Sequence, residues 1–219
     1  MKHIASITTL TLVAAAGFAD AAAPAAAPAS AWSQSANLAL TSNYVWRGVT
    51  QTANHMAVQG GFDIANTSGI SAGVWASNVN QNAEDGNNLE VDLYANYGFK
   101  VAGIDASVGY IAYVYQGNSS ANFSEVNVAA TVAGITGKVS KNITAGNDYY
   151  YELAYNYNVP AVKDLVLGLH YGWADRDSTT KDYSIGLTYP VLGFSGNVTY
   201  SNGSSSIDKI TAVTLKKTF

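Results

Sequence analysis

After residue 35 the sequence is a series of runs in which apolar and polar residues alternate, separated by turn residues. An alternation with a period of two residues predicts β-strands. The runs are about 8–12 residues long, which suits transmembrane strands of ~9–11 residues better than the ~5–6 residues common in soluble sandwiches. The predicted strands are 36–47, 57–65, 70–78, 89–100, 104–115, 123–132, 135–142, 148–159, 165–174, 180–191, 194–202 and 206–219.

Short links and long links alternate along the chain. The one departure is link 203–205, which is short although its position is that of a long link. The short links are 66–69, 101–103, 133–134, 160–164 and 192–193. Outer-membrane barrels join their strands by short periplasmic turns and longer extracellular loops. The predicted fold is therefore all-β, a single-domain antiparallel transmembrane β-barrel of about 12 strands over residues 36–219, with both termini periplasmic.

The last run, 206–219, ends on the aromatic residue Phe219. A barrel in lipid needs its final strand to pair with its first, because an open sheet edge would leave backbone groups without hydrogen bonds. We therefore expect 206–219 to pair antiparallel with 36–47. We also expect this strand to engage the barrel-assembly machinery.

Aromatic residues gather near the two ends of the apolar strand faces, with Leu, Val, Ile, Ala and Gly between them. The predicted outer group is Tyr44, Trp46, Tyr110, Tyr149, Tyr171, Trp173, Tyr183 and Tyr200, and the inner group is Phe62, Tyr97, Phe99, Tyr157, Tyr189, Phe194 and Phe219. Tyr and Trp favour the headgroup level of a membrane, so two such belts favour a barrel in lipid over a soluble sandwich. The expected location is the cell outer membrane, with lipid and lipopolysaccharide as neighbours.

The N-terminus has the pattern of a secretory signal peptide. Lys2 precedes an apolar run over 4–18, and Ala19-Asp20-Ala21 resembles a cleavage site. We expect a cleaved signal peptide over 1–21 and an Ala/Pro-rich spacer over 22–35.

Composition excludes several classes of function. Only 12% of the residues are charged, against about a quarter in soluble domains, and the net charge is −4. That charge argues against nucleic acid as a partner, which would need a basic face. The absence of cysteine excludes disulfides and Cys-based zinc sites.

Charged residues on the polar strand faces are the candidate lumen and mouth residues. They are Arg47, Asp63, Glu90, Asp92, Asp105, Glu125, Glu152, His170, Asp182 and Asp208. Acids outnumber bases, so an open lumen would weakly favour cations. The alternative is that these side chains pair with one another and fill a small barrel.

Arg47 lies in the stretch 41–52, where aromatic, charged and turn residues are most concentrated. Tyr44 and Trp46 are predicted to face lipid at the outer belt, which places Arg47 on the lumen side of the mouth. We expect Arg47 to pair with Asp208 or with a carboxylate of the first loops. Two roles remain open: a strut that fixes the seam, or a selector of anions.

Four blocks in the first half carry a resemblance to a known family: SNYVWRGVTQT (42–52), AVQGGFDI (57–64), GVWASNV (73–79) and EVDLYANYGF (90–99). They resemble the TorF-type porin family, also called the Gcw_chp outer-membrane family. The resemblance implies a Gram-negative outer-membrane barrel with a transport role. It supplies no catalytic or ligand-binding residues.

The chain offers little for catalysis. His55 and His170 have no Ser or acid at a convincing spacing, and no phosphate-binding loop or paired metal-ligand motif stands out. We expect no enzyme activity, no catalytic residues, no metal and no cofactor. The predicted function is a porin-like channel for passive diffusion of small polar solutes or ions. The alternative is a non-conducting structural or adhesive barrel that acts through its loops.

Overall fold

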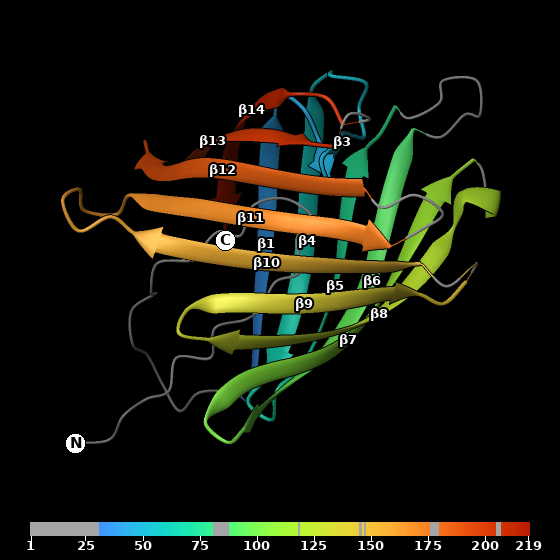
Figure 1. Cartoon of the computed structure of the whole chain (residues 1–219), viewed down its shortest axis with the longest axis vertical. Helices are drawn as coiled ribbons and strands as arrows, with labels where there is room; N and C mark the ends of the chain where they lie inside the picture. Colours follow the sequence, from blue (N-terminus) through green and yellow to red (C-terminus); the bar gives the residue numbers. More distant parts are fainter. Residues whose placement is uncertain are drawn as a thin grey trace.

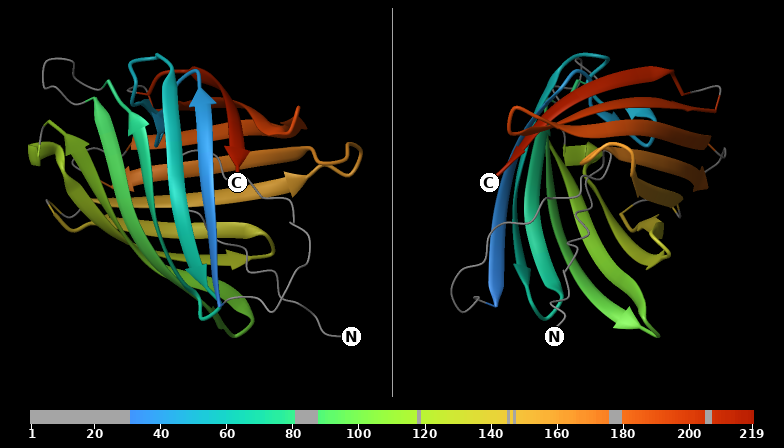
Figure 2. Two further views of the ribbon diagram at one scale, coloured as in Figure 1. Left: turned by 180° about the vertical axis from the view of Figure 1, so that it is seen from behind. Right: turned by 90° about the vertical axis from the view of Figure 1, so that its left-hand side faces the viewer.

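The computed structural model describes residues 31–80, 88–117, 119–144, 146, 148–175, 180–204 and 207–219. The predicted signal peptide (1–21) and most of the predicted spacer lie outside these residues. Within them, twelve strands form one closed barrel, and every neighbouring pair is antiparallel (Figures 1 and 2). The predicted all-β barrel is confirmed.

The barrel strands follow one another around the wall in chain order. They are β1 (Trp32–Thr41), β4 (Ala57–Asn66), β5 (Ile70–Asn78), β6 (Leu89–Val101), β7 (Ile104–Gln116), β8 (Phe123–Val132), β9 (Ile135–Asn142), β10 (Tyr149–Asn158), β11 (Val166–Asp175), β12 (Thr180–Val191), β13 (Phe194–Gly203) and β14 (Ile210–Thr218). A separate two-stranded sheet pairs β2 (Val45–Trp46) with β3 (Val49–Thr50), and a short helical turn η2 covers Ser119–Ala121.

The predicted closure between the last and first strands is confirmed. β14 pairs antiparallel with β1 from Asn37↔Thr218 to Thr41↔Thr214, and the two strands lie side by side in Figure 2. The backbones of Ala36 and Phe219 exchange two further hydrogen bonds of 3.2 and 2.8 Å. The last strand is therefore hydrogen-bonded to the first, and the sheet closes on itself.

The outer surface of the barrel is apolar. Leu93, Val198 and Leu187, which lie midway along their strands on the outer face, are each about half exposed. Their neighbours on the opposite parity, such as Asp92 and Asn197, are 4% and 5% exposed. An apolar outer face around a closed sheet is the surface that a barrel presents to lipid. No helix among the described residues is long and apolar enough to cross a membrane.

The two ends of the barrel differ. Trp32, Phe219 and the short turns predicted from the sequence lie at one end, called here the short-turn end. The turn Leu192-Gly193 has φ of 51° and 80°, the positive values of a two-residue type I′ hairpin that matches strand twist. The longer links meet at the other end, called here the long-link end.

The first strand was predicted wrongly. It begins at Trp32 and ends at Thr41 instead of spanning 36–47, and β14 begins at Ile210 instead of 206. After Thr41 the side chains of Thr41 and Ser42 bond to backbone groups, Thr41 to Asn43 O (2.9 Å) and Ser42 to Val213 N (2.9 Å). Such local bonds compete with the sheet ladder and release the chain from the wall. The following residues therefore turn into the barrel.

Candidate functional site

Residues 42–56 form an inward loop, called here the lumen loop, that enters the barrel from the long-link end. Its tip is the β2–β3 hairpin, and Arg47 and Gly48 carry φ of 49° and 80° in a type I′ turn. A Cβ on Gly48 would lie 2.7 Å from the Cβ of Asp182 and 3.0 Å from Ile207, so glycine is needed both for its backbone and for space. The tip therefore reaches across the barrel to β12.

The lumen loop is held in shape by its own polar side chains. The Asn43 carboxamide oxygen accepts hydrogen bonds from Thr50 Oγ1 (2.6 Å) and Thr52 Oγ1 (3.1 Å), and its nitrogen donates to Asn54 Oδ1 (2.8 Å). Thr52 Oγ1 also accepts from the backbone N–H of Tyr44 at 3.1 Å. Because Asn43 and Thr52 are 6% and 0% exposed, this network acts as a small core within the loop.

Arg47 fixes the loop to the far wall. Its guanidinium donates two hydrogen bonds to Glu125 of β8, at 2.8 and 2.7 Å, and lies 4.2 and 4.0 Å from the ring centroids of Trp46 and Tyr150. Burial acts to lower the pKa of Arg47, but the hydrogen bonds and charge of Glu125 outweigh it, so the pKa is raised. This bidentate contact is the strongest kind of protein ion pair.

Tyr44 fixes the base of the loop to the near wall. It is 1% exposed, its ring meets Trp75 of β5 edge-on at 5.3 Å, and its hydroxyl donates to Glu90 Oε1 of β6 at 3.1 Å. Burial, and next the charge of Glu90, raise the pKa of the Tyr44 hydroxyl well above its ordinary value. The predicted lipid-facing position of Tyr44 and Trp46 is therefore wrong, since both lie inside the barrel.

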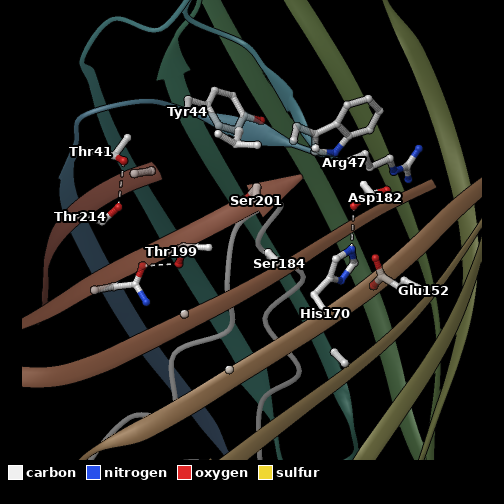
Figure 3. A pocket seen from close by; sticks show the side chains of 18 of the residues that line it. Thr41, Tyr44, Arg47, Glu152, His170, Asp182, Ser184, Thr199, Ser201 and Thr214 are labelled. Carbon is white, nitrogen blue, oxygen red and sulfur yellow. Dashed lines mark hydrogen bonds and ion pairs between the residues drawn. The ribbon is translucent and has the colours of Figure 1, made fainter. Parts of the chain in front are cut away.

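Beside the lumen loop the barrel encloses a cavity of about 310 Å³. On β10 its lining runs from Tyr150 to Asn156, and on β12 from Asp182 to Thr188, so it extends from the hairpin toward the short-turn end. Hydroxyl and carboxamide groups dominate the wall of β1 and β12–β14, where Thr41 bonds Thr214 and Asn197 bonds Thr199 (Figure 3). This wall offers hydrogen-bond donors and acceptors, with Asp182 and Lys216 as its charged residues.

Four of the titratable groups that line the cavity form two pairs. Lys138 of β9 meets Glu152 of β10 at 2.5 Å, and His170 Nε2 lies 3.0 Å from Asp182 Oδ1. The Tyr150 hydroxyl lies within 3.2 Å of both His170 and Asp182, and it joins them in one cluster (Figure 3 shows the His170–Asp182 contact). Such pairing reduces the net field in the cavity.

The predicted site residues lie in four parts of the barrel. Glu152, His170 and Asp182 line the cavity with Arg47, while Glu90, Asp92 and Glu125 lie on the β6–β8 wall that the lumen loop contacts. Asp63 accepts a hydrogen bond from Tyr94 at 2.5 Å.

The two remaining candidates lie at the rims of the barrel. Asp105 pairs with Lys100 at the exposed short-turn rim, and Asp208 is exposed just before β14. The predicted Arg47–Asp208 pair is wrong, because the partner is Glu125 on the opposite side of the barrel.

Sequence reasoning missed Tyr150 as a site residue. It lies on the same strand face as Glu152, Ala154 and Asn156, which all line the cavity. The signal that could have identified Tyr150 is its place as an aromatic residue on the inward, otherwise polar face of a barrel strand. Among the described residues no group of three His, Cys, Asp or Glu side chains is placed to hold a metal ion.

Several solved structures share the fold. The KdgM porin matches with a TM-score of 0.60 at 10% identity, over 84% of this chain and 98% of that one. KdgM in complex with disordered oligogalacturonate gives 0.57 at 10% identity, over 85% and 97%, and the Acinetobacter baumannii outer membrane protein Omp33 gives 0.52 at 6% identity, over 86% and 97%. At such identities the likeness concerns the fold, that of small outer-membrane β-barrels.

A comparison with curated protein sequences returns no match. The family comparison does: the model described as "Bacterial protein of unknown function (Gcw_chp)" matches residues 25–218, nearly the whole chain. With its closed barrel, apolar belt and porin-like fold, this outer-membrane protein belongs to the Gcw_chp family.

Proposed function

We propose that the protein is a channel through which small polar solutes or ions diffuse passively across the outer membrane. The observation that carries this proposal is the polar cavity inside a closed, lipid-facing barrel, bordered by a defined loop that narrows one end. The resemblance to KdgM and Omp33 in fold supports it. The lumen loop would set the constriction, as inward loops narrow other barrels.

The lining supports weak selectivity by charge. The cavity is bordered by Arg47, Lys138 and Lys216 and by Glu152 and Asp182, so positive and negative groups nearly balance. The acids that suggested a cation-favouring lumen lie partly behind the lumen loop: Glu90, Asp92 and Glu125 are 2%, 4% and 4% exposed. The hydroxyl and carboxamide groups of Ser184, Thr188, Asn197, Thr199 and Thr214 on β12–β14 would suit hydroxyl-rich solutes such as sugars. Oligogalacturonate, which is present in a complex of KdgM, is a sugar polymer that also carries carboxylates.

The orientation belongs to the same proposal. The short-turn end, with both termini, would face the periplasm, and the lumen loop would enter from outside. Residues 1–21 would be removed as a signal peptide. Strand β14 would be the segment that engages the barrel-assembly machinery, and the apolar belt would contact lipid and lipopolysaccharide.

A non-conducting barrel is the second candidate, and one observation favours it. Between Tyr44, which contacts Glu90, and Arg47, which contacts Glu125, the lumen loop covers the β6–β8 side of the barrel. If it also closes the path beside it, the protein would act through its exposed loops. We propose no enzyme activity, because the His170–Asp182–Tyr150 cluster is directed into the barrel and away from lipid substrate.

Planar-bilayer recording of the purified protein separates the two candidates. The channel proposal expects discrete conductance steps that grow when Trp46→Ala removes an indole ring that borders the cavity. The steps should be unchanged by Lys163→Ala, which alters an exposed residue at the short-turn end. No steps from the wild type or from Trp46→Ala would favour the non-conducting barrel. Phospholipid hydrolysis that is lost in His170→Ala would contradict the non-enzymatic assignment.

A further inference from the structure

Two carboxyl groups lie side by side under the lumen loop. Glu90 and Asp92 are two residues apart on the inward face of β6, and they are 2% and 4% exposed. Glu90 Oε1 accepts the hydrogen bond of Tyr44, but Glu90 Oε2 and Asp92 Oδ1 are buried and have no hydrogen-bond partner among the described residues. Both orphaned atoms are acceptors, so each of them needs a hydrogen-bond donor.

A proton is the ligand that supplies this donor. Two neighbouring ionised carboxylates buried away from water repel each other and lose their hydration, so such a pair retains one proton. The protonated group can then donate to the other. A divalent cation fits less well, because Ca²⁺ takes ~6–8 oxygen ligands and Mg²⁺ about six. No three metal-ligating side chains meet among the residues described.

Among the described residues, no cationic side chain forms an ion pair with Glu90 or Asp92. On β5, Ser77 lies opposite Glu90 and Trp75 opposite Asp92, and on β7 the corresponding residues are Tyr115 and Tyr113. The charged and titratable side chains that face the pair from the neighbouring elements are Tyr44 of the lumen loop, Tyr94 of β6, Tyr113 and Tyr115 of β7, and Glu125 of β8. Arg47 is committed to Glu125 by two hydrogen bonds.

We propose that Glu90 and Asp92 form a proton-binding site that keeps the lumen loop docked. With one proton bound, the pair carries a single negative charge, which the Tyr44 hydroxyl stabilises from the loop. When the proton leaves to solvent, two negative charges remain in a site that the loop seals from water. Water reaches them only if Tyr44 and its segment move away, so alkaline pH releases the loop.

The test measures loop docking directly, at one pH, so that intrinsic exchange rates are equal. We compare amide hydrogen exchange of peptides covering 43–52 in detergent at about pH 9, several units above the ordinary pKa of a carboxyl group. Asp92→Asn places a permanent neutral donor in the pair, and Glu90→Gln is the second variant. Asp105→Asn makes the same change at the exposed rim and serves as the matched control.

We expect the wild type and Asp105→Asn to exchange faster than Asp92→Asn, by about tenfold for each pH unit by which the assay lies above the titration of the pair. Near pH 6 the difference should vanish. Equal exchange at pH 9, or a difference abolished by EDTA, would overturn the proton site. If both variants fail to fold, the wild type alone is compared at pH 6 and pH 9. Loop exchange that rises no more than the intrinsic exchange rate between these pH values would also overturn the proton site.

A conductance arm rests on the proposed channel function. Channels of the wild type should widen on raising the pH, and those of Asp92→Asn should not. If the protein forms no channels but the exchange difference is present, the channel proposal fails and the proton site stands. If channels form without any pH response and exchange is equal, the proton site alone fails.

Discussion

The change Glu125→Gln tests how strongly the lumen loop is held. It removes the charge that pairs with Arg47 but keeps the size of the side chain. The side chains of Arg47 and Glu125 are 13% and 5% exposed, so the pair is shielded from solvent and salt. Removing one partner of a buried pair costs about 3–5 kcal/mol, because the other charge is left uncompensated.

The low end of that range applies here, because the loop can undock and Arg47 then becomes hydrated. About 3 kcal/mol corresponds to roughly a 100-fold shift toward the undocked loop, at 1.4 kcal/mol per tenfold. Hydrogen exchange of the backbone amide of Gln51, which donates to Tyr44 O at 2.7 Å, should accelerate by about that factor. The stacking of Arg47 on Trp46 and Tyr150 remains and limits the effect.

The double variant Arg47→Met with Glu125→Gln supplies the internal control. With both charges removed, no uncompensated charge is left, and most of the protection should return. Exchange in Glu125→Gln within about twofold of the wild type would refute the role of the Arg47–Glu125 pair in holding the loop. A double variant that exchanges as fast as the single one would refute it as well. Asp105→Asn, at the exposed Lys100–Asp105 pair, should leave the loop unchanged.

Other variants test the wall and the lining. Lys138→Met leaves Glu152 without its ion-pair partner in the cavity and should shift the reversal potential in a salt gradient toward cation selectivity. Glu152→Gln should shift the reversal potential toward anion selectivity. Shifts of the two variants in the same direction would contradict a role of the Lys138–Glu152 pair in the lining. Val198→Lys places a charge in the middle of the apolar belt and should cost about 2–4 kcal/mol in folding into liposomes. Thr214→Val removes the 2.8 Å bond to Thr41 at the seam and should cost about 1 kcal/mol in the same assay, with no loss arguing against a role in closure.

Most of the barrel was predictable because each strand has its own periodicity. In β8, β9 and β12 the predicted and observed bounds coincide, since the flanking turn residues stop the alternation sharply. The pairing of β14 with β1 followed from the need to leave no open edge. These features depend on the alternation within each strand and on the requirement that a sheet in lipid has no open edge.

The lumen loop was not predictable in the same way. Tyr44 and Trp46 continue the parity of the first strand, so periodicity alone extends that strand to residue 47. The residues that hold the loop inside lie far along the chain: Glu125 is 78 residues from Arg47, and Glu90 is 46 residues from Tyr44. A single sequence holds no local sign of such contacts, and an expectation based on the nearest strand gave Asp208 instead.

The seam between Ala36 and Phe219 also determines the order in which the barrel can form. Around the wall, every other pairing is a hairpin between consecutive strands, except that β1 and β4 are joined across the lumen loop. Only β1 and β14, in register from Asn37↔Thr218, join the two ends of the sheet. Contacts between distant residues form slowly, because the chain entropy must be lost before the pairing rewards it. Sheet growth can proceed strand by strand, but closure is a single late event, and until it occurs both edges remain free to pair with another chain.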